Sequence, residues 1–224
     1  WQAVIVSLCQ LESSLFLGKP YRNSGIKRLW LDPNQFINIQ SKCSSTKNSE
    51  HLPTFLHRLF PNLRHLAIHI PECDSANFDP NILLTLLTQW IQLTTLVLDI
   101  QLSYSQSAAL CDALNSAHHL KHLSLGYHFQ VTLSQLAPTL GRLERLAIES
   151  PNDKSAVFQH LGPACTHLWS DTKPLTSFNL FKALRTNPRF FAQLTHFRLR
   201  LHFDDVTMKL LCVNAANLQH LDID

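Results

Sequence analysis

A short pattern of leucines, Leu-x-x-Leu-x-Leu, recurs along most of this chain and constrains its fold more than any other feature. The clearest copy is NLRHLAI, which begins at Asn62, and Ile or Phe replaces Leu in some of the others. The further copies are GIKRLWL from Gly25, QLTTLVL from Gln92, HLKHLSL from His119, RLERLAI from Arg142, QLTHFRL from Gln193 and NLQHLDI from Asn217, with a weaker copy, CTHLWS, from Cys165. Such recurrence predicts a repeat architecture in which each unit packs mainly on its two neighbours.

Segments with apolar residues at helical spacing separate these copies. HLPTFLHRLF, for example, places Leu52, Phe55, Leu56 and Leu59 on one face of a helix. We expect helices within residues 51–60, 81–91, 105–117, 132–140, 155–162, 178–192 and 205–215. A strand followed by a helix in every unit predicts a parallel sheet with the helices packed on one side of it.

Repeats of this form resemble the leucine-rich repeat. Counted from the first motif position, at residues 26, 63, 93, 120, 143, 165, 194 and 218, the repeat lengths run from 22 (143 to 165) to 37 (26 to 63). Irregular lengths and helices of several turns resemble the ribonuclease-inhibitor-like and F-box leucine-rich-repeat group. The resemblance implies an α/β fold, a right-handed solenoid with a concave parallel sheet and convex helices.

The resemblance covers nearly the whole chain, so we expect residues 1–224 to form a single solenoid. Residues 1–24 hold a worn first repeat, and the polar stretch 33–50, rich in Ser, Asn and Lys, is expected to be a flexible insertion. The sequence begins without an initiator Met and stops inside a repeat. We therefore expect it to be a fragment of a longer chain.

Composition argues against several classes of protein. A formal net charge of +3 is too small to indicate a nucleic-acid-binding or polybasic membrane protein. No apolar run approaches the roughly 20 residues that span a bilayer. The six cysteines form no Cys-x-x-Cys pair, and the chain has no Asn-x-Ser/Thr acceptor. Cys111, Cys165 and Cys212 are expected to act as small hydrophobes, and a reducing compartment, cytoplasm or nucleus, is favoured.

Alternation along each strand predicts which side chains face outward. Motif positions 1, 4 and 6 should point into the core, and positions 3, 5 and 7 should project from the concave sheet. Position 3 gives Arg28, His65, Thr95, His122, Arg145, His167, His196 and His220. Position 5 gives Trp30, Ala67, Val97, Ser124, Ala147, Trp169, Arg198 and Asp222. Position 7 is largely acidic, with Asp32, Asp99, Glu149, Asp171 and Asp224 among its members.

The candidate partner-binding residues are the cationic and aromatic members of positions 3 and 5: Arg28, Trp30, His65, His122, Arg145, His167, Trp169, His196, Arg198 and His220. Positions 3 and 7 lie roughly 13 Å apart along a strand, beyond the ~8 Å screening length of physiological salt, so the acidic column should barely neutralise the Arg/His column. The hypothesis is a groove that binds an acidic partner protein or peptide, more tightly below pH ~6.5. The alternative is that Arg and His merely cover the sheet.

Two tryptophans on the concave face are sharper candidates, because Trp is enriched in interface hot spots. Trp30 is expected to be exposed. For Trp169, in the weakest repeat, a register slip that turns the ring inward is an open alternative. Trp90 follows an apolar helix and is expected in the core.

No motif for catalysis, a metal or a cofactor is present. Gly18-Lys19 lacks the approach of a phosphate loop, and no nucleophile elbow or zinc-protease motif occurs. His118, His119 and His122 are close in sequence, but no Cys or carboxylate nearby completes a metal site. Asp204-Asp205 is expected to cap a helix. We therefore predict no enzymatic activity.

The resemblance implies a protein-binding scaffold, most specifically the substrate-recognition region of an F-box-type ubiquitin ligase receptor. In that group an F-box ahead of the repeats holds the cullin-ligase adaptor. The LP-x-E-like F-box motif is absent here, and Leu52-Pro53 lies too deep in the repeats to supply it. Two alternatives stay open: an interaction scaffold without a ligase link, and a GTPase-activating regulator, which a stimulated GTP-hydrolysis assay would identify.

Overall fold

The computed structural model describes residues 28–31, 52–70, 80–100, 104–126, 133–149, 154–175, 177–201 and 204–223. The strands are β1 (Arg28–Leu31), β2 (His65–Ile70), β3 (Thr95–Ile100), β4 (His122–Leu125), β5 (Arg145–Ile148), β6 (His167–Leu175), β7 (His196–Leu201) and β8 (His220–Ile223). The helices are α3 (Leu52–Leu59), α4 (Pro80–Gln89), α5 (Tyr104–Ser116), the 3-10 turn η2 (Leu133–Leu136) with α6 (Ala137–Leu140), α7 (Lys154–His160), α8 (Ser177–Thr186), α9 (Pro188–Gln193) and α10 (Asp205–Asn214).

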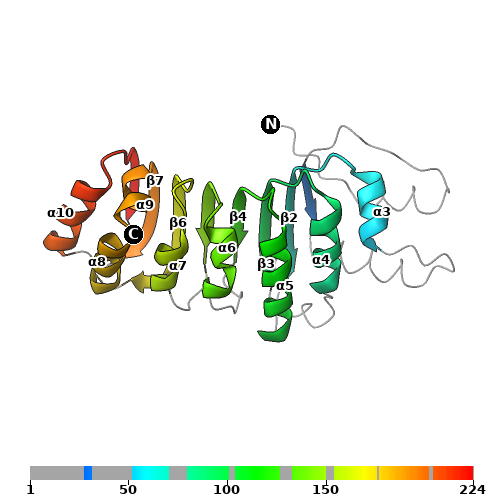
Figure 1. Ribbon diagram of the computed structural model, residues 1–224, viewed down its shortest axis with the longest axis horizontal. Helices are drawn as coiled ribbons and strands as arrows, with labels where there is room; N and C mark the ends of the chain where they lie inside the picture. The colour runs from blue at the N-terminus through cyan, green and yellow to red at the C-terminus, as the bar shows by residue number, and fades with distance from the viewer. Residues whose placement is uncertain are drawn as a thin grey trace.

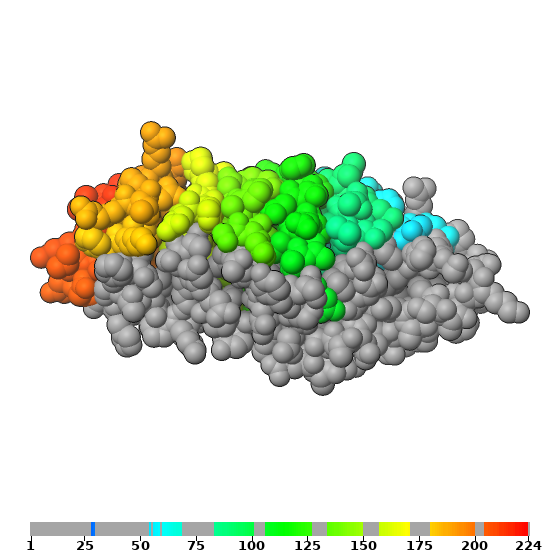
Figure 2. Space-filling model, turned by 60° about the horizontal axis from the view of Figure 1, so that its bottom comes forward, coloured from blue at the N-terminus to red at the C-terminus, as the bar shows by residue number. Residues whose placement is uncertain are grey.

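One parallel sheet runs through these described residues. Its eight strands are hydrogen-bonded in chain order from β1 to β8, with helices packed along one side. Figures 1 and 2 show the repeats following one another along the long axis, from α3 at one end to α10 at the other. The chain is thus the α/β leucine-rich-repeat solenoid that the sequence predicts, with the right-handed crossovers usual for parallel strand–helix–strand units.

The register of the sheet matches the motif. Position 3 pairs with position 3 across every strand boundary, from Arg28 opposite His65 to His196 opposite His220. No slip occurs at the weak repeat until after Ser170, where β6 shifts against β7. Side chains of one motif position therefore form continuous rows across the sheet.

A repeated backbone contact holds this register at the start of the strands. The carbonyl at motif position 2 accepts hydrogen bonds from the amides of positions 2 and 3 of the next repeat. The Thr94 carbonyl, for instance, accepts from Lys121 and His122 at 2.9 Å each. The same pair of bonds recurs at every described boundary from β2 to β8, so the position 3 side chains leave the sheet at equivalent points.

The buried core contains the predicted positions 1, 4 and 6. Cys165 and Ser170 fill positions 1 and 6 of the weak repeat and are buried like the Leu and Ile residues that they replace. The last repeat is an exception, because no further element of the described chain covers β8: Leu221 is 38% exposed, and Leu218 and Ile223 are only partly buried. Cys212 also departs from the prediction: it is exposed on α10, whereas Cys111 and Cys165 are buried.

Helix boundaries differ from the predicted ranges where proline or a cap intervenes. The segment 178–192 divides into α8 and α9 because Pro188 begins a new helix, whose N-cap Asn187 accepts a bond from the Phe190 amide. Asn187 also donates to the carbonyls of Phe158 and Leu161 at 2.9 and 3.1 Å, which ties α9 to the preceding repeat. Asp204 caps α10 as predicted, accepting from the Thr207 amide at 2.7 Å.

Some predictions fall beyond the described part of the chain. These are the worn first repeat in residues 1–24, the insertion at 33–50 and the exposure of the Trp30 side chain. The side chains of Asp32, Asp171 and Asp224 in the acidic column also lie outside it. Trp90 is buried, as expected. Within the described residues, no helix combines the length and apolar character needed to cross a membrane.

Candidate functional site

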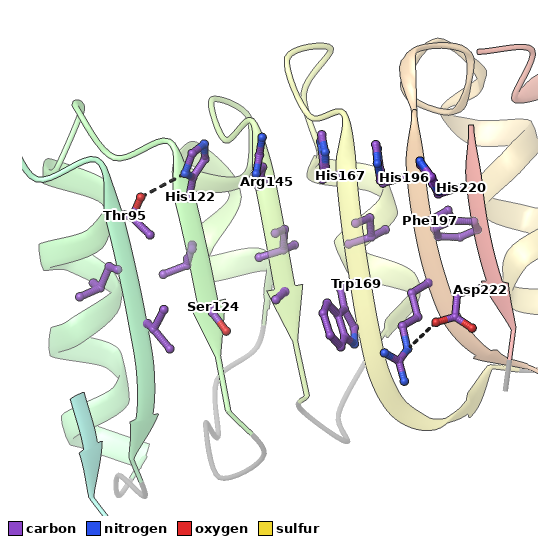
Figure 3. Close-up of a pocket in the computed structure, with 17 residues that line it drawn as sticks. Thr95, His122, Ser124, Arg145, His167, Trp169, His196, Phe197, His220 and Asp222 are labelled. Atoms are coloured by element: carbon purple, nitrogen blue, oxygen red, sulfur yellow. Dashed lines mark hydrogen bonds and ion pairs between the residues drawn. The ribbon is translucent and has the colours of Figure 1, made fainter. Parts of the chain in front are cut away.

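The concave side of the sheet contains a groove of about 420 Å³ that runs from β3 to β8. Two rows of side chains project into it (Figure 3). The upper row, from motif position 3, is Thr95, His122, Arg145, His167, His196 and His220. The lower row, from motif position 5, is Val97, Ser124, Ala147, Trp169, Arg198 and Asp222.

The three histidines at the β8 end of the upper row are stacked. The ring centroids of His167 and His196 lie 4.1 Å apart with an interplanar angle of 8°. Those of His196 and His220 lie 4.4 Å apart at 27°. These spacings are close to the ~4.8 Å between neighbouring strands, so the register of the sheet places the rings face to face.

Threonines at motif position 2 orient two of these rings. The Thr195 hydroxyl donates to the Thr166 carbonyl at 3.0 Å and lies 3.0 Å from Nδ1 of His196. A hydroxyl has one hydrogen, so Nδ1 of His196 must donate to it, which leaves Nε2 of the neutral ring as an acceptor. Thr166 lies 2.8 Å from Nδ1 of His167 and makes a longer bond, 3.5 Å, to the Glu144 carbonyl.

Arg145 is the charged centre of the upper row. Its guanidinium is exposed between His122 and His167, and no carboxylate among the described residues forms an ion pair with it. Burial, and next the positive charge of Arg145, lower the pKa of both histidines below the ordinary value. At neutral pH the row therefore places the Arg145 cation, which pairs with no described carboxylate, between two neutral rings.

The carboxylate of Glu144, the residue before Arg145 in the chain, contacts Lys121 and His122 instead. Its Oε1 accepts from Lys121 Nζ at 2.6 Å, and Oε2 lies 3.7 Å from Nε2 of His122. The hydrogen bond from Lys121 holds the pKa of the Glu144 carboxyl below its usual value. His65, outside the groove on β2, also has a lowered pKa, through burial and then Arg28.

Trp169 stands out in the lower row. It is 48% exposed, so the predicted alternative of an inward-turned ring is wrong. The Arg198 guanidinium lies 4.6 Å from the centroid of the indole, over one face of it, and Arg198 Nε is 3.2 Å from Asp222 Oδ2. The small side chains of Ser124 and Ala147 on the neighbouring strands leave space beside the ring.

The structure brings together seven of the ten predicted residues: His122, Arg145, His167, Trp169, His196, Arg198 and His220 line the groove. Arg28 and His65 continue the upper row on β1 and β2 but do not line it, and nothing is described of the Trp30 side chain. The sequence prediction considered only motif positions 3, 5 and 7, so it did not include Glu144, Thr166 and Thr195 at position 2, which contact the histidines of the upper row. The dipeptide Thr-His, whose histidine begins both β6 and β7, was the available signal for the two threonines.

The described residues contain no cluster of metal ligands, and two of their cysteines are buried. No group of three or more His, Cys, Asp or Glu among them could hold a metal ion. His118 is exposed and His119 half-buried in the turn before β4. Burial raises the pKa of the Cys111 and Cys165 thiols to about 12, so neither supplies a thiolate near neutral pH.

Comparison with known proteins finds similarity among solved structures. No family model matches this chain, and no curated protein matches it. Among solved structures, the leucine-rich-repeat-containing protein LegL7 from Legionella pneumophila is similar at 12% sequence identity and a TM-score of 0.46. The match covers 95% of this chain and 86% of that one.

Proposed function

We propose that this protein is a non-catalytic scaffold that binds a partner protein in the groove on its concave face, through an acidic region of that partner. The observation that supports this most directly is Arg145, an exposed guanidinium at the centre of the groove without an ion pair to any described carboxylate. An interfacial charge of this kind selects a partner of opposite sign and accelerates the encounter.

Exposed aromatic surface supports the same proposal. Trp169 keeps 48% of its surface accessible at the floor of the groove, beside Arg198. Trp and Arg are the residues most enriched among hot spots, which cluster near the centre of an interface. The groove therefore combines a charged and an aromatic anchor, unlike a sheet that polar side chains merely cover.

Proton binding should tighten this contact at low pH. The lowered pKa values of His122 and His167 mean that both rings are neutral at pH 7 and gain charge only below the ordinary histidine range. Affinity for an acidic partner should thus rise at a lower pH than the value near 6.5 expected from sequence. An anion bound at Arg145 would offset its field and raise both pKa values, so binding should take up protons.

Comparative capture from cells tests the proposal. We would immobilise the wild-type protein, the variant Arg145→Glu and the control Arg189→Glu, which alters an exposed arginine on α9 outside the groove. Proteins retained by the wild type and the control but lost from Arg145→Glu, and lost as salt is raised, would support the proposal. Retention of every captured protein by Arg145→Glu would contradict it.

The finer proposal is that the solenoid is the substrate-recognition region of an F-box-type ubiquitin ligase receptor. It is supported by the resemblance of the irregular repeats, 22 to 37 residues long, to that group. Leu52-Pro53 begins α3 inside the repeats, so an F-box would have to lie elsewhere in the full-length protein. Co-purification of the full-length protein with the cullin-ligase adaptor is the test, and its absence would leave a scaffold without a ligase link.

A further inference from the structure

The middle of the groove divides into a charged part and an apolar part on the same strand. Arg145 occupies position 3 of β5 and Ala147 occupies position 5, two residues further on. Two rises of ~3.3 Å separate these positions by ~6.6 Å. An acidic group at Arg145 would therefore lie beside a shallow floor of small side chains, formed by Ala147 and the neighbouring Ser124.

Trp169 closes one side of this floor. Figure 3 places its indole on the side of β6 that faces the strand of Arg145. Arg198, paired with Asp222, covers one face of the ring, and 48% of the residue remains accessible. The opposite face is open toward Ala147, one strand spacing or ~4.8 Å away. Arg198 and Asp222 thus lie on the side of the ring away from Ala147.

This geometry fits an extended partner segment. Side chains at i and i+2 of an extended chain lie on one face and are separated by the same ~6.6 Å as positions 3 and 5. We infer that the groove binds a partner segment with a carboxylate side chain two residues from a bulky apolar or aromatic side chain. The carboxylate pairs with Arg145 between His122 and His167, and the apolar side chain packs on Ala147 against Trp169.

The inference rests on the proposed function and specifies the chemistry of the partner. Charge alone would favour any acidic segment. A charged site at Arg145 next to the floor at Ala147 favours one spacing between the acidic and the apolar side chains of the segment. A contact with Trp169 increases the affinity given by the ion pair only if one partner segment reaches both Arg145 and Trp169. Glu and Phe two residues apart meet this condition in either chain direction, and Glu and Phe next to each other do not, because adjacent side chains of a strand point to opposite faces.

Short synthetic peptides test the spacing. The probes are Gly/Ser heptapeptides with a central Glu-Ser-Phe, Phe-Ser-Glu, Glu-Phe or Gln-Ser-Phe, and binding is measured by isothermal titration calorimetry and by tryptophan fluorescence. At least one of the two spaced Glu/Phe peptides should bind about tenfold more tightly than the Glu-Phe and Gln-Ser-Phe peptides, a difference of ~1.4 kcal/mol.

Variants assign the two contacts. Arg145→Gln should remove the advantage of Glu over Gln, and Trp169→Ala should remove the advantage of the spaced over the adjacent peptide. Arg189→Gln and Ile91→Ala, which alter an exposed arginine and an exposed apolar residue outside the groove, should change neither. Circular dichroism of each variant confirms that it is folded.

The outcomes separate this inference from the proposed function. Equal binding of spaced and adjacent peptides, or binding that survives both groove variants, overturns the inference. Failure of both spaced peptides to bind at millimolar concentration overturns it as well. In each of these cases, a partner that depends on Arg145 in the capture experiment would still support binding on the concave face.

Discussion

The contact between two glycines allows a sharp test of how closely neighbouring repeats pack. Gly162 follows α7 and is buried, and its amide donates to the Leu140 carbonyl at 3.3 Å. A Cβ at Gly162 would collide with the Gly141 carbonyl oxygen and come within 2.7 Å of the Gly141 carbonyl carbon. Both are backbone atoms, so Gly162→Ala can be accommodated only if one repeat moves against the next.

Gly141 supplies a matched control at the other side of the same contact. It has φ −63° and ψ −20°, a conformation that alanine adopts readily. The nearest atom to its Cβ would be the Ala137 carbonyl oxygen at 3.4 Å, an ordinary contact. Gly141→Ala should therefore be neutral or stabilise the protein by roughly 0.4–1 kcal/mol through the unfolded chain.

Gly162→Ala should instead destabilise the protein by about 1–3 kcal/mol, the usual cost of overpacking. For a chain of this size, each kcal/mol changes the melting temperature by roughly 2–4 °C. Thermal melting of the wild type and both variants, monitored by circular dichroism, should thus show a melting temperature lower by about 2–12 °C for Gly162→Ala alone. Equal melting temperatures for the two variants would refute the reasoning that backbone contact fixes the distance between these repeats.

Three further predictions concern the groove and the core. Lowering the pH from 7.5 to 5.5 should destabilise the protein, because His122 and His167 have folded-state pKa values below the unfolded value and the unfolded chain therefore binds protons first. A melting temperature that rises over this range would contradict the prediction. Arg145→Gln should raise the pKa of both histidines, which NMR titration of the ring resonances can measure. Unchanged pKa values would show that the Arg145 charge is screened. Trp90 is 1% exposed, so Trp90→Ala should lower the free energy of unfolding by about 3–5 kcal/mol. Trp169 is 48% exposed, so Trp169→Ala should lower it far less. Equal losses in denaturant unfolding would refute the assignment of Trp169 to the surface.

Most of the fold could be predicted from the sequence because the repeat imposes its own register. Once Leu66, Leu96 and Leu123 are taken as core residues, the period of two along a strand decides that their neighbours face outward. Continuous rows at positions 3 and 5 follow without knowledge of any tertiary contact. The weak repeat obeyed the same rule because Cys165 and Ser170 are small enough to be buried where Leu and Ile stand elsewhere.

Helix ends could not be predicted from apolar periodicity, because caps and prolines decide them and that periodicity does not record either. The apolar pattern of residues 178–192 is compatible with one helix, yet Asn187 and Pro188 begin a second one. The side chain of Asn187 is held by carbonyls of the preceding repeat, at Phe158 and Leu161. No local pattern reports such contacts between units distant in sequence.

By itself, the sequence determined the strand–helix repeat, the rows of the concave face and the identity of the residues in them, because these depend on local periodicity. The tertiary structure decided what those residues do to one another. The stacking of His167 on His196 and the pairing of Arg198 with Asp222 over Trp169 both depend on distances between strands, as does the lack of an ion pair between Arg145 and any described carboxylate. Those distances arise only when separate repeats are hydrogen-bonded into one sheet, so the chemistry of the groove is a property of the assembled solenoid.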